Sequence, residues 1–365
     1  MSAPLRQIDL DTVGTIALGS TILGTGGGGD PYVGRLMAEQ AIRACGPVTL
    51  VDPDEVPRDA FVFLVGMMGA PAVIVEKLPS GKESLRAIEA LAQRFGRKIT
   101  HICCLEAGGI NSMIPIAAAA RTGLPLIDAD GMGRAFPELQ MLLPTLDGIK
   151  TTPMAMVDEK GNNLIIDTLD NHSAEAFARN ATVQMGASAT MAFYPLTGDQ
   201  VRSALVPRTY GMAYRIGRAL YEARRAHLDP VAAVAKQLGG AVIFSGKVVD
   251  VMRRTVAGFQ RGVAVFDGIA AWSARSLVMD FQNEFLIARR DGNVVVTTPD
   301  LICLVDAQTA EPVTTETLRY GQRLAVVAAP CYPRWRSEAG LKIVGPQYFG
   351  YDAPYIPFDP RSEVR

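Results

Sequence analysis

Over the first third of the chain, short apolar runs alternate with stretches of helical apolar spacing, and this alternation constrains the fold more than any single motif. The runs predict buried strands at 47–51, 60–65, 99–105 and 125–128, and the spacing predicts helices at 33–45, 84–95 and 114–122. Such alternation is typical of an open, mostly parallel sheet with helices on both faces. Ligands bind such sheets at the carboxyl ends of the strands, so the residues that follow each strand are candidate site residues.

A glycine cluster, GTGGGGD at 24–30, precedes the first predicted helix. Glycines let the backbone approach a ligand closely, and amides that lead into a helix favour an anion or an electron-rich ring. The loop lacks the Gly-Lys-Ser/Thr ending of a Walker loop, and it meets the dinucleotide fingerprint only in part, with Asp52 as the acidic residue after the next strand. The cluster predicts a ligand-binding loop; the alternative is a glycine-rich turn without a ligand.

The rest of the chain changes character twice. Residues 173–237 have helical spacing and are rich in Ala and Arg, and after residue 246 strand-like segments are separated by turn signals such as Asp291-Gly292. A chain of 365 residues is long enough for two or three domains. We therefore expect an α/β domain with the glycine-rich loop at 1–167, a mainly helical connecting region at 168–245 and a β-rich domain at 246–365.

Composition argues against nucleic-acid and membrane partners. The net charge is −1, and no basic stripe is interleaved with aromatic residues. The apolar window 60–75 is interrupted by Gly and Pro and is too short to cross a bilayer. The start of the chain lacks the charged and apolar regions of a signal peptide, and the five cysteines are scattered and odd in number. We therefore expect a cytoplasmic protein with reduced thiols.

Acidic side chains follow two of the predicted strands. Glu106 stands where one strand ends, and Asp128 and Asp130 point to the same side of the next one because side chains in a strand alternate. Two close carboxyl groups can share a cation or a proton, and their proximity separates their pKa values into acid and base roles. The alternative is structural, with one aspartate capping a turn and the other paired to Arg134.

Histidine is scarce, with three in the chain. No His-x-His, His-Glu-x-x-His or Gly-x-Ser-x-Gly element occurs, which argues against the common zinc proteases and the α/β-hydrolases. Carboxylates would therefore supply most of the ligands of any divalent metal such as zinc. The sequence leaves the need for a metal open.

Long motifs run in order through nearly the whole chain: GTGGGGDPY at 24–32, GMMGAP at 66–71, EAGGIN at 106–111, DADGMGRAFPE at 128–138, FQNE at 281–284 and GPQYFGYD at 345–352. In these motifs the chain resembles the S-methyl thiohydantoin desulfurase-like proteins, a family often encoded near hydantoinases.

The resemblance implies an N-terminal Rossmann-like open sheet, a C-terminal β-rich domain and a hydrolase that acts on a cyclic amide or amidine. The implied reaction adds water to the C=N carbon of an S-methyl thiohydantoin and releases a hydantoin and methanethiol. Asp128 or Asp130 is then the base, and Glu106 orients it or shares a metal. The residues proposed to bind substrate are Gly26, Gly27, Gly28, Gly29, Asp30, Lys77, Asn111, Arg134 and Asn283.

Two other functions stay open. A non-catalytic binding protein would use the glycine loop for a nucleotide or a carboxylate, and a dinucleotide-dependent oxidoreductase would use it for its cofactor. Asn283 likewise has a structural alternative, in which it satisfies backbone groups at the start of a strand. The expected partner of the enzyme is a small heterocyclic substrate, and the large apolar content predicts a homo-oligomer.

Overall fold

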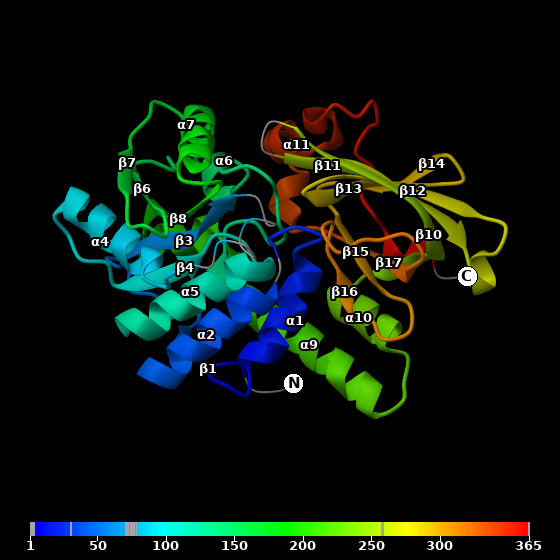
Figure 1. Ribbon diagram of the computed structural model, residues 1–365, viewed down its shortest axis with the longest axis horizontal. Helices are drawn as coiled ribbons and strands as arrows, with labels where there is room; N and C mark the ends of the chain where they lie inside the picture. The colour runs from blue at the N-terminus through cyan, green and yellow to red at the C-terminus, as the bar shows by residue number, and fades with distance from the viewer. Residues whose placement is uncertain are drawn as a thin grey trace. The chain divides into compact units, whose positions relative to one another are not determined.

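The computed structural model describes residues 4–29, 31–69, 73, 77, 79–256 and 259–363. The chain is a mixed α/β protein with two sheets, and it divides into two compact units (Figure 1). The first unit comprises Met1–Ala17, Gly29–Gly133 and Glu138–Met212, and the second comprises Leu18–Gly28, Arg134–Pro137 and Ala213–Arg365. Two short stretches from the N-terminal half of the chain, 18–28 and 134–137, therefore belong to the second unit.

The sheet of the first unit has four neighbouring parallel strands in the order β2-β5-β4-β3, extended by antiparallel strands on both sides. The full order is β1-β2-β5-β4-β3-β8-β6-β7, and β9 pairs with β5. The strands are β1 (Gln7–Ile8), β2 (Val48–Val51), β3 (Phe61–Gly69), β4 (His101–Cys104), β5 (Leu126–Asp130), β6 (Met154–Val157), β7 (Asn163–Ile166), β8 (Ser188–Thr197) and β9 (Val206–Pro207). Because β3, β4 and β5 are parallel neighbours, their carboxyl ends lie at one edge of the sheet.

Helices cover both faces of this sheet. Figure 1 shows α5 and α7 on opposite faces, with α2 packed against α5. Gly34 of α2 permits that packing, because a Cβ there would lie 2.8 Å from Cγ1 of Ile110. The helices are α2 (Pro31–Cys45), α4 (Glu83–Phe95), α5 (Gly109–Thr122), α6 (Leu143–Leu146), α7 (Asn171–Gln184) and α8 (Gly198–Ala204), while α1 (Val13–Leu23) and α9 (Thr209–Arg225) each continue from the first unit into the second.

The second unit is built on an antiparallel sheet in the order β14-β13-β12-β11-β10-β17-β15-β16. Phe244, Phe266, Phe281 and Phe285 are fully or almost fully buried in its core. Helix α10 (Pro230–Leu238) packs on β10 and β17. The strands are β10 (Ala241–Val256), β11 (Phe259–Gly268), β12 (Ser276–Gln282), β13 (Glu284–Arg290), β14 (Asn293–Thr297), β15 (Leu301–Asp306), β16 (Pro312–Val313) and β17 (Arg323–Ala329).

One buried carboxylate fastens the C-terminal segment of the second unit, which includes α11 (Glu338–Val344). Asp300 is fully buried, and its Oδ1 accepts from the backbone N–H of Cys331 at 2.8 Å and from Nη2 of Arg336 at 2.9 Å. Its Oδ2 accepts from the hydroxyl of Tyr355 at 2.9 Å and from the N–H of Phe358 at 2.8 Å. Four donors from a stretch of about 30 residues thus share one side chain.

The predicted strands and helices of the first third are confirmed to within a few residues. Seven strands are missing from the prediction: β1, β6, β7, β8, β9, β12 and β16. β8 interrupts the stretch expected to be helical, and β12 lies within the β-rich part. β8 is paired on both sides and almost wholly buried, so the alternation that marks a half-exposed strand is absent from it. In the part of the chain that the structure describes, no helix has the length and apolarity to cross a membrane.

Candidate active site

The carboxyl ends of β3, β4 and β5 bring together four polar residues that the sequence singles out. Glu106 follows β4, and Asp128 and Asp130 lie in β5. Asn111 lies in the first turn of α5, the helix that follows the β4 loop. All four side chains are buried. We call these four residues the acidic cluster.

Asn111 links Glu106 to β3. Its Nδ2 donates to Oε1 of Glu106 at 2.7 Å, and its Oδ1 accepts from the backbone N–H of Met67 at 2.8 Å. Because the Met67 N–H can only donate, it requires an oxygen opposite it and so fixes which end of the Asn111 amide faces Glu106. Glu106 is 4% exposed and Asn111 is 8% exposed, so the carboxylate has little freedom to rotate.

Asp130 is fully buried and ties together the loops after β4 and β5. One of its oxygens accepts from the N–H of Ala107, and the other accepts from the N–H groups of Gly133 at 2.8 Å and Met132 at 3.3 Å. Burial raises the pKa of Asp130 to about 7, although these backbone donors favour the charged form. Its bond to Ala107 holds the residue next to Glu106 in the chain.

Asp128 has donors of its own. Its Oδ1 accepts from the N–H of Gly211 at 3.0 Å, and its carbonyl oxygen accepts from the N–H of Arg208. The negative charge of Asp128 contributes to the raised pKa of Asp130, so the two carboxyl groups interact electrostatically. Met67, Ala107 and Gly211 enter the cluster through backbone amides, for which a side-chain pattern in the sequence carries no signal.

The apolar run before the glycine cluster is the helix α1. The dinucleotide fingerprint requires a strand at that place, so the partial match seen in the sequence does not have the structural context of such a site. Gly24 to Gly28 belong to the second unit and Gly29 to the first. Gly28 and Gly29 both have a φ of 77°, a conformation that favours glycine. Asp30 lies outside the described residues.

Packing against β13 explains two of the glycines. A Cβ on Gly26 would lie 2.5 Å from the ring of Phe285, and a Cβ on Gly27 would lie 2.0 Å from Oε1 of Glu284. The carbonyl oxygen of Gly26 accepts from the N–H of Thr315 at 2.9 Å. These contacts hold Gly26 and Gly27 within the second unit.

Arg134 is fully buried in the second unit, and its guanidinium donates to backbone carbonyls. It reaches the oxygens of Asp300 at 2.7 Å, of Ala135 and Phe285 at 3.1 Å, and of Pro299 at 3.4 Å. Burial lowers its pKa, and the nearby charge of Glu284 opposes that shift. The ion pair between Arg134 and an aspartate of β5, which was the structural alternative in the sequence, is therefore not how this side chain is satisfied.

Asn283 and Lys77 also have defined partners. Asn283, at a φ of 57°, accepts at Oδ1 from the N–H of Gln260 at 2.9 Å, which is the backbone role weighed for it in the sequence. Nζ of Lys77 lies 2.5 Å from Oε2 of Glu159 and donates to the carbonyl oxygen of Met185 at 2.5 Å. In the described conformation, both side chains are engaged within the protein.

A metal-binding cluster does not appear among the residues that the structure describes: no three His, Cys, Asp or Glu side chains gather there as ligands. The five cysteines are free thiols, and four of them are buried. Burial raises the pKa of Cys103 and Cys104 well above its usual range, and nearby Asp130 adds to both shifts. These two thiols are therefore poor nucleophiles and poor metal ligands.

Comparison with known proteins gives two family matches and a similar solved structure. The model of the S-Me-THD-like N-terminal domain matches residues 11–168, and the model of the S-Me-THD-like C-terminal domain matches residues 169–358. No curated protein matches the chain. An X-ray structure of a protein from Chromobacterium violaceum shares the fold, with a TM-score of 0.81 and 24% sequence identity over 97% of this chain and 100% of that one. The two family matches together cover nearly the whole chain, which belongs to the S-Me-THD-like family.

Proposed function

We propose that the protein is a hydrolase that replaces the methylthio group of an S-methyl thiohydantoin by oxygen. The observation that carries this proposal is the buried Glu106 carboxylate, oriented by Asn111 at the carboxyl ends of parallel strands. The order β2-β5-β4-β3 supports a Rossmann-like use of that edge for a ligand. The family name supplies the substrate class.

The proposed reaction is an addition followed by an elimination. Glu106 accepts a proton from water while the water oxygen bonds to the C=N carbon that carries the methylthio group, and a ring nitrogen takes up the electron pair. The C–S bond then breaks, the nitrogen lone pair restores the C=N bond, and the departing methanethiolate receives the proton from Glu106. The hydroxyl-bearing ring tautomerises to the hydantoin, so the products are a hydantoin and methanethiol.

Glu106 suits the role of base better than Asp130 does. Both oxygens of Asp130 accept from backbone amides, and a proton acceptor needs an oxygen that can face the water. Asp130 is therefore proposed as a positioning residue that acts through the Ala107 amide. Asn111 is a second positioning residue, since its amide sets the rotation of the Glu106 carboxylate.

The test measures thiol release with a chromogenic disulfide from S-methylated and unmethylated thiohydantoin propionate. The wild-type protein should release methanethiol from the methylated compound, and Glu106→Gln should lower kcat by about 10²–10⁴-fold, the usual contribution of a general base. Glu83→Gln is the matched control, because Glu83 is equally buried at 4% exposure and bonds only to the nearby Ser80 N–H among the contacts described. Its kcat should stay within about twofold of wild type.

Two results would overturn the proposal. Undetectable thiol release by the wild-type protein would remove the desulfurase activity and favour a binding protein. Full activity in Glu106→Gln, with loss of activity in Asp128→Asn, would move the base to β5. Prior chelation is run in parallel, so that a metal requirement is recognised separately from the role of Glu106.

A further inference from the structure

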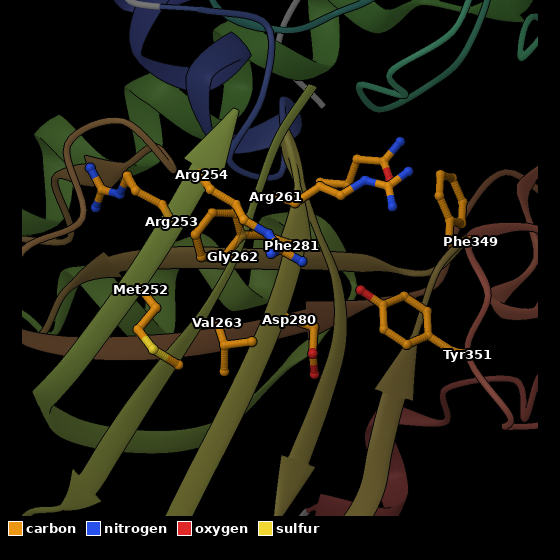
Figure 2. A pocket seen from close by; sticks show the side chains of 11 residues that line it. Met252, Arg253, Arg254, Arg261, Gly262, Val263, Asp280, Phe281, Phe349 and Tyr351 are labelled. Atoms are coloured by element: carbon orange, nitrogen blue, oxygen red, sulfur yellow. The ribbon is translucent and has the colours of Figure 1, made fainter. Parts of the chain in front are cut away.

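A basic pocket of about 450 Å³ lies on the sheet of the second unit (Figure 2). Two of the sequence motifs contribute to its lining: FQNE at 281–284 and GPQYFGYD at 345–352. Its floor is formed by β10, β11 and β12, and its wall by the C-terminal segment. Its lining residues include Met252, Arg254, Arg261, Asp280, Phe349 and Tyr351.

Strand register places the floor residues on one face. Met252 of β10 pairs with Val263 of β11. Two residues further along β10, Arg254 pairs with Arg261 of β11. Val263 in turn pairs with Asp280 of β12. Because side chains two apart in a strand share a face, the apolar row of Met252 and Val263 lies beside the two arginines. The floor thus has one row that is apolar except for Asp280 and one row that carries the two arginines.

The two arginines carry charge that the protein itself does not neutralise. They stand directly opposite each other on antiparallel strands, an arrangement that is destabilising for like charges. Both are exposed, and among the described residues neither forms an ion pair or a side-chain hydrogen bond. The acidic group of the pocket, Asp280, is engaged by Arg289 of β13. The pocket therefore holds two uncompensated positive charges.

Aromatic rings face this charge. Figure 2 shows Phe349 and Tyr351 on the side of the pocket where Arg261 and Asp280 project. The guanidinium carbon of Arg289 lies over the Tyr351 ring, 5.8 Å from its centre, and this cation–π contact favours the position of the ring. Burial raises the pKa of Tyr351, so its hydroxyl stays protonated and able to donate. Flat rings and arginine forks are the two elements that bind a planar anion.

We propose that this pocket binds a small planar ring that carries an oxyanion, either a carboxylate or a phosphate. Arg254 and Arg261 bind the oxyanion, the ring stacks on Tyr351 or Phe349, and Met252 and Val263 contact its edge. The proposal stands apart from the desulfurase activity, since none of these residues belongs to the acidic cluster.

The test is isothermal titration of the full-length protein with three probes: orotate, adenosine monophosphate and inorganic phosphate. Orotate or adenosine monophosphate should bind saturably with one site per chain, and binding should weaken as salt is raised. Arg254→Gln and Arg261→Gln should each weaken it about tenfold or more, the loss expected for one charge-assisted hydrogen bond. Tyr351→Ala should weaken the ring-bearing probes but not inorganic phosphate.

Arg323→Gln is the matched control. Arg323 is an exposed arginine of the same sheet that also stands opposite a like charge, Lys247, but it does not line the pocket. It should leave binding unchanged. Binding of orotate alone identifies a carboxylate ligand, and binding of adenosine monophosphate alone identifies a phosphate ligand. Absence of saturable binding by both, equal loss in Arg323→Gln, or equally tight binding of inorganic phosphate would overturn the proposal.

Discussion

The acidic cluster lies in the first unit, and Gly24 to Gly28 of the glycine loop lie in the second. Both regions carry dense sequence motifs, but hydrogen bonds hold the first in place and close packing holds the second. In the acidic cluster, polar side chains hold one another and nearby backbone amides through hydrogen bonds such as Asn111 to Glu106. In the glycine loop, the neighbours are a ring and a carboxylate from β13, and Gly26 and Gly27 are needed because those groups fill the space.

The two kinds of motif therefore carry different structural information. A polar residue that directly follows a strand is placed by that strand, so its sequence position already indicates its surroundings. A run of glycines reports only that something comes close, and the identity of that neighbour depends on contacts far along the chain. Here the neighbours of Gly26 and Gly27 are about 260 residues away.

The comparison predicts its largest effect for a methyl group added to the glycine loop. Gly26→Ala should lower the free energy of unfolding by about 2–4 kcal/mol, because the Cβ meets the buried Phe285 ring and the φ of 93° is strained for alanine. Gly46→Ala has nearly the same φ, 97°, with nothing within 4 Å, and should cost only about 1 kcal/mol. Chemical denaturation measures both. Equal losses would show that backbone strain, and not packing, makes Gly26 necessary.

In the acidic cluster the corresponding loss comes from hydrogen bonds. Asn111→Ala leaves the Met67 N–H and Oε1 of Glu106 without the partner they share, so it should lower the free energy of unfolding by about 1–3 kcal/mol. It should also lower kcat, because the Glu106 carboxylate loses its orientation. Asn293→Ala removes an exposed amide and should change stability by less than about 0.5 kcal/mol. If kcat were unchanged in Asn111→Ala, Asn111 would have no positioning role.

A further prediction concerns the pH dependence of stability. Burial raises the pKa of Asp130 from its ordinary value of 3.8 to about 7 in the folded protein, so the folded state binds an extra proton between these pH values. Its contribution to stability is therefore full below pH 3.8 and is lost as pH rises to about 7. Plots of the free energy of unfolding against pH should differ in slope between wild type and Asp130→Asn by at most about 1.4 kcal/mol per pH unit. Parallel stability curves from pH 4 to 7 would contradict a raised pKa for Asp130.

The parts of the fold that could be predicted are those in which local pattern and long-range environment agree. The apolar runs that became β2 to β5 lie in a parallel sheet and read as continuous hydrophobic stretches. β8 could not be recognised, because its residues Ser188 to Tyr194 are buried on both faces without alternation and follow a helix of mixed composition. Strand pairing across the sheet, and not local propensity, decides its conformation.

In the candidate site, the acidic side chains could be predicted from the sequence and their hydrogen-bond donors could not. Glu106, Asp128 and Asp130 are identifiable because each lies within the last three residues of a strand or closely follows one. The donors that orient them are not, since Met67, Ala107 and Gly211 contribute main-chain N–H groups that any residue but proline provides. The sequence also groups the glycine loop with the first predicted domain, whereas in the structure Gly26 contacts Phe285 and Thr315 and belongs to the second unit.

The Asp300 carboxylate determines how the C-terminal segment of the second unit unfolds locally. Its four donors are spread from Cys331 to Phe358, so losing that acceptor releases the whole segment at once and not one bond at a time. Such a segment behaves as one local unfolding unit, whose amides exchange with solvent together. Phe349 and Tyr351 lie inside it, so a ligand seated in the basic pocket would slow exchange even at amides that it never contacts.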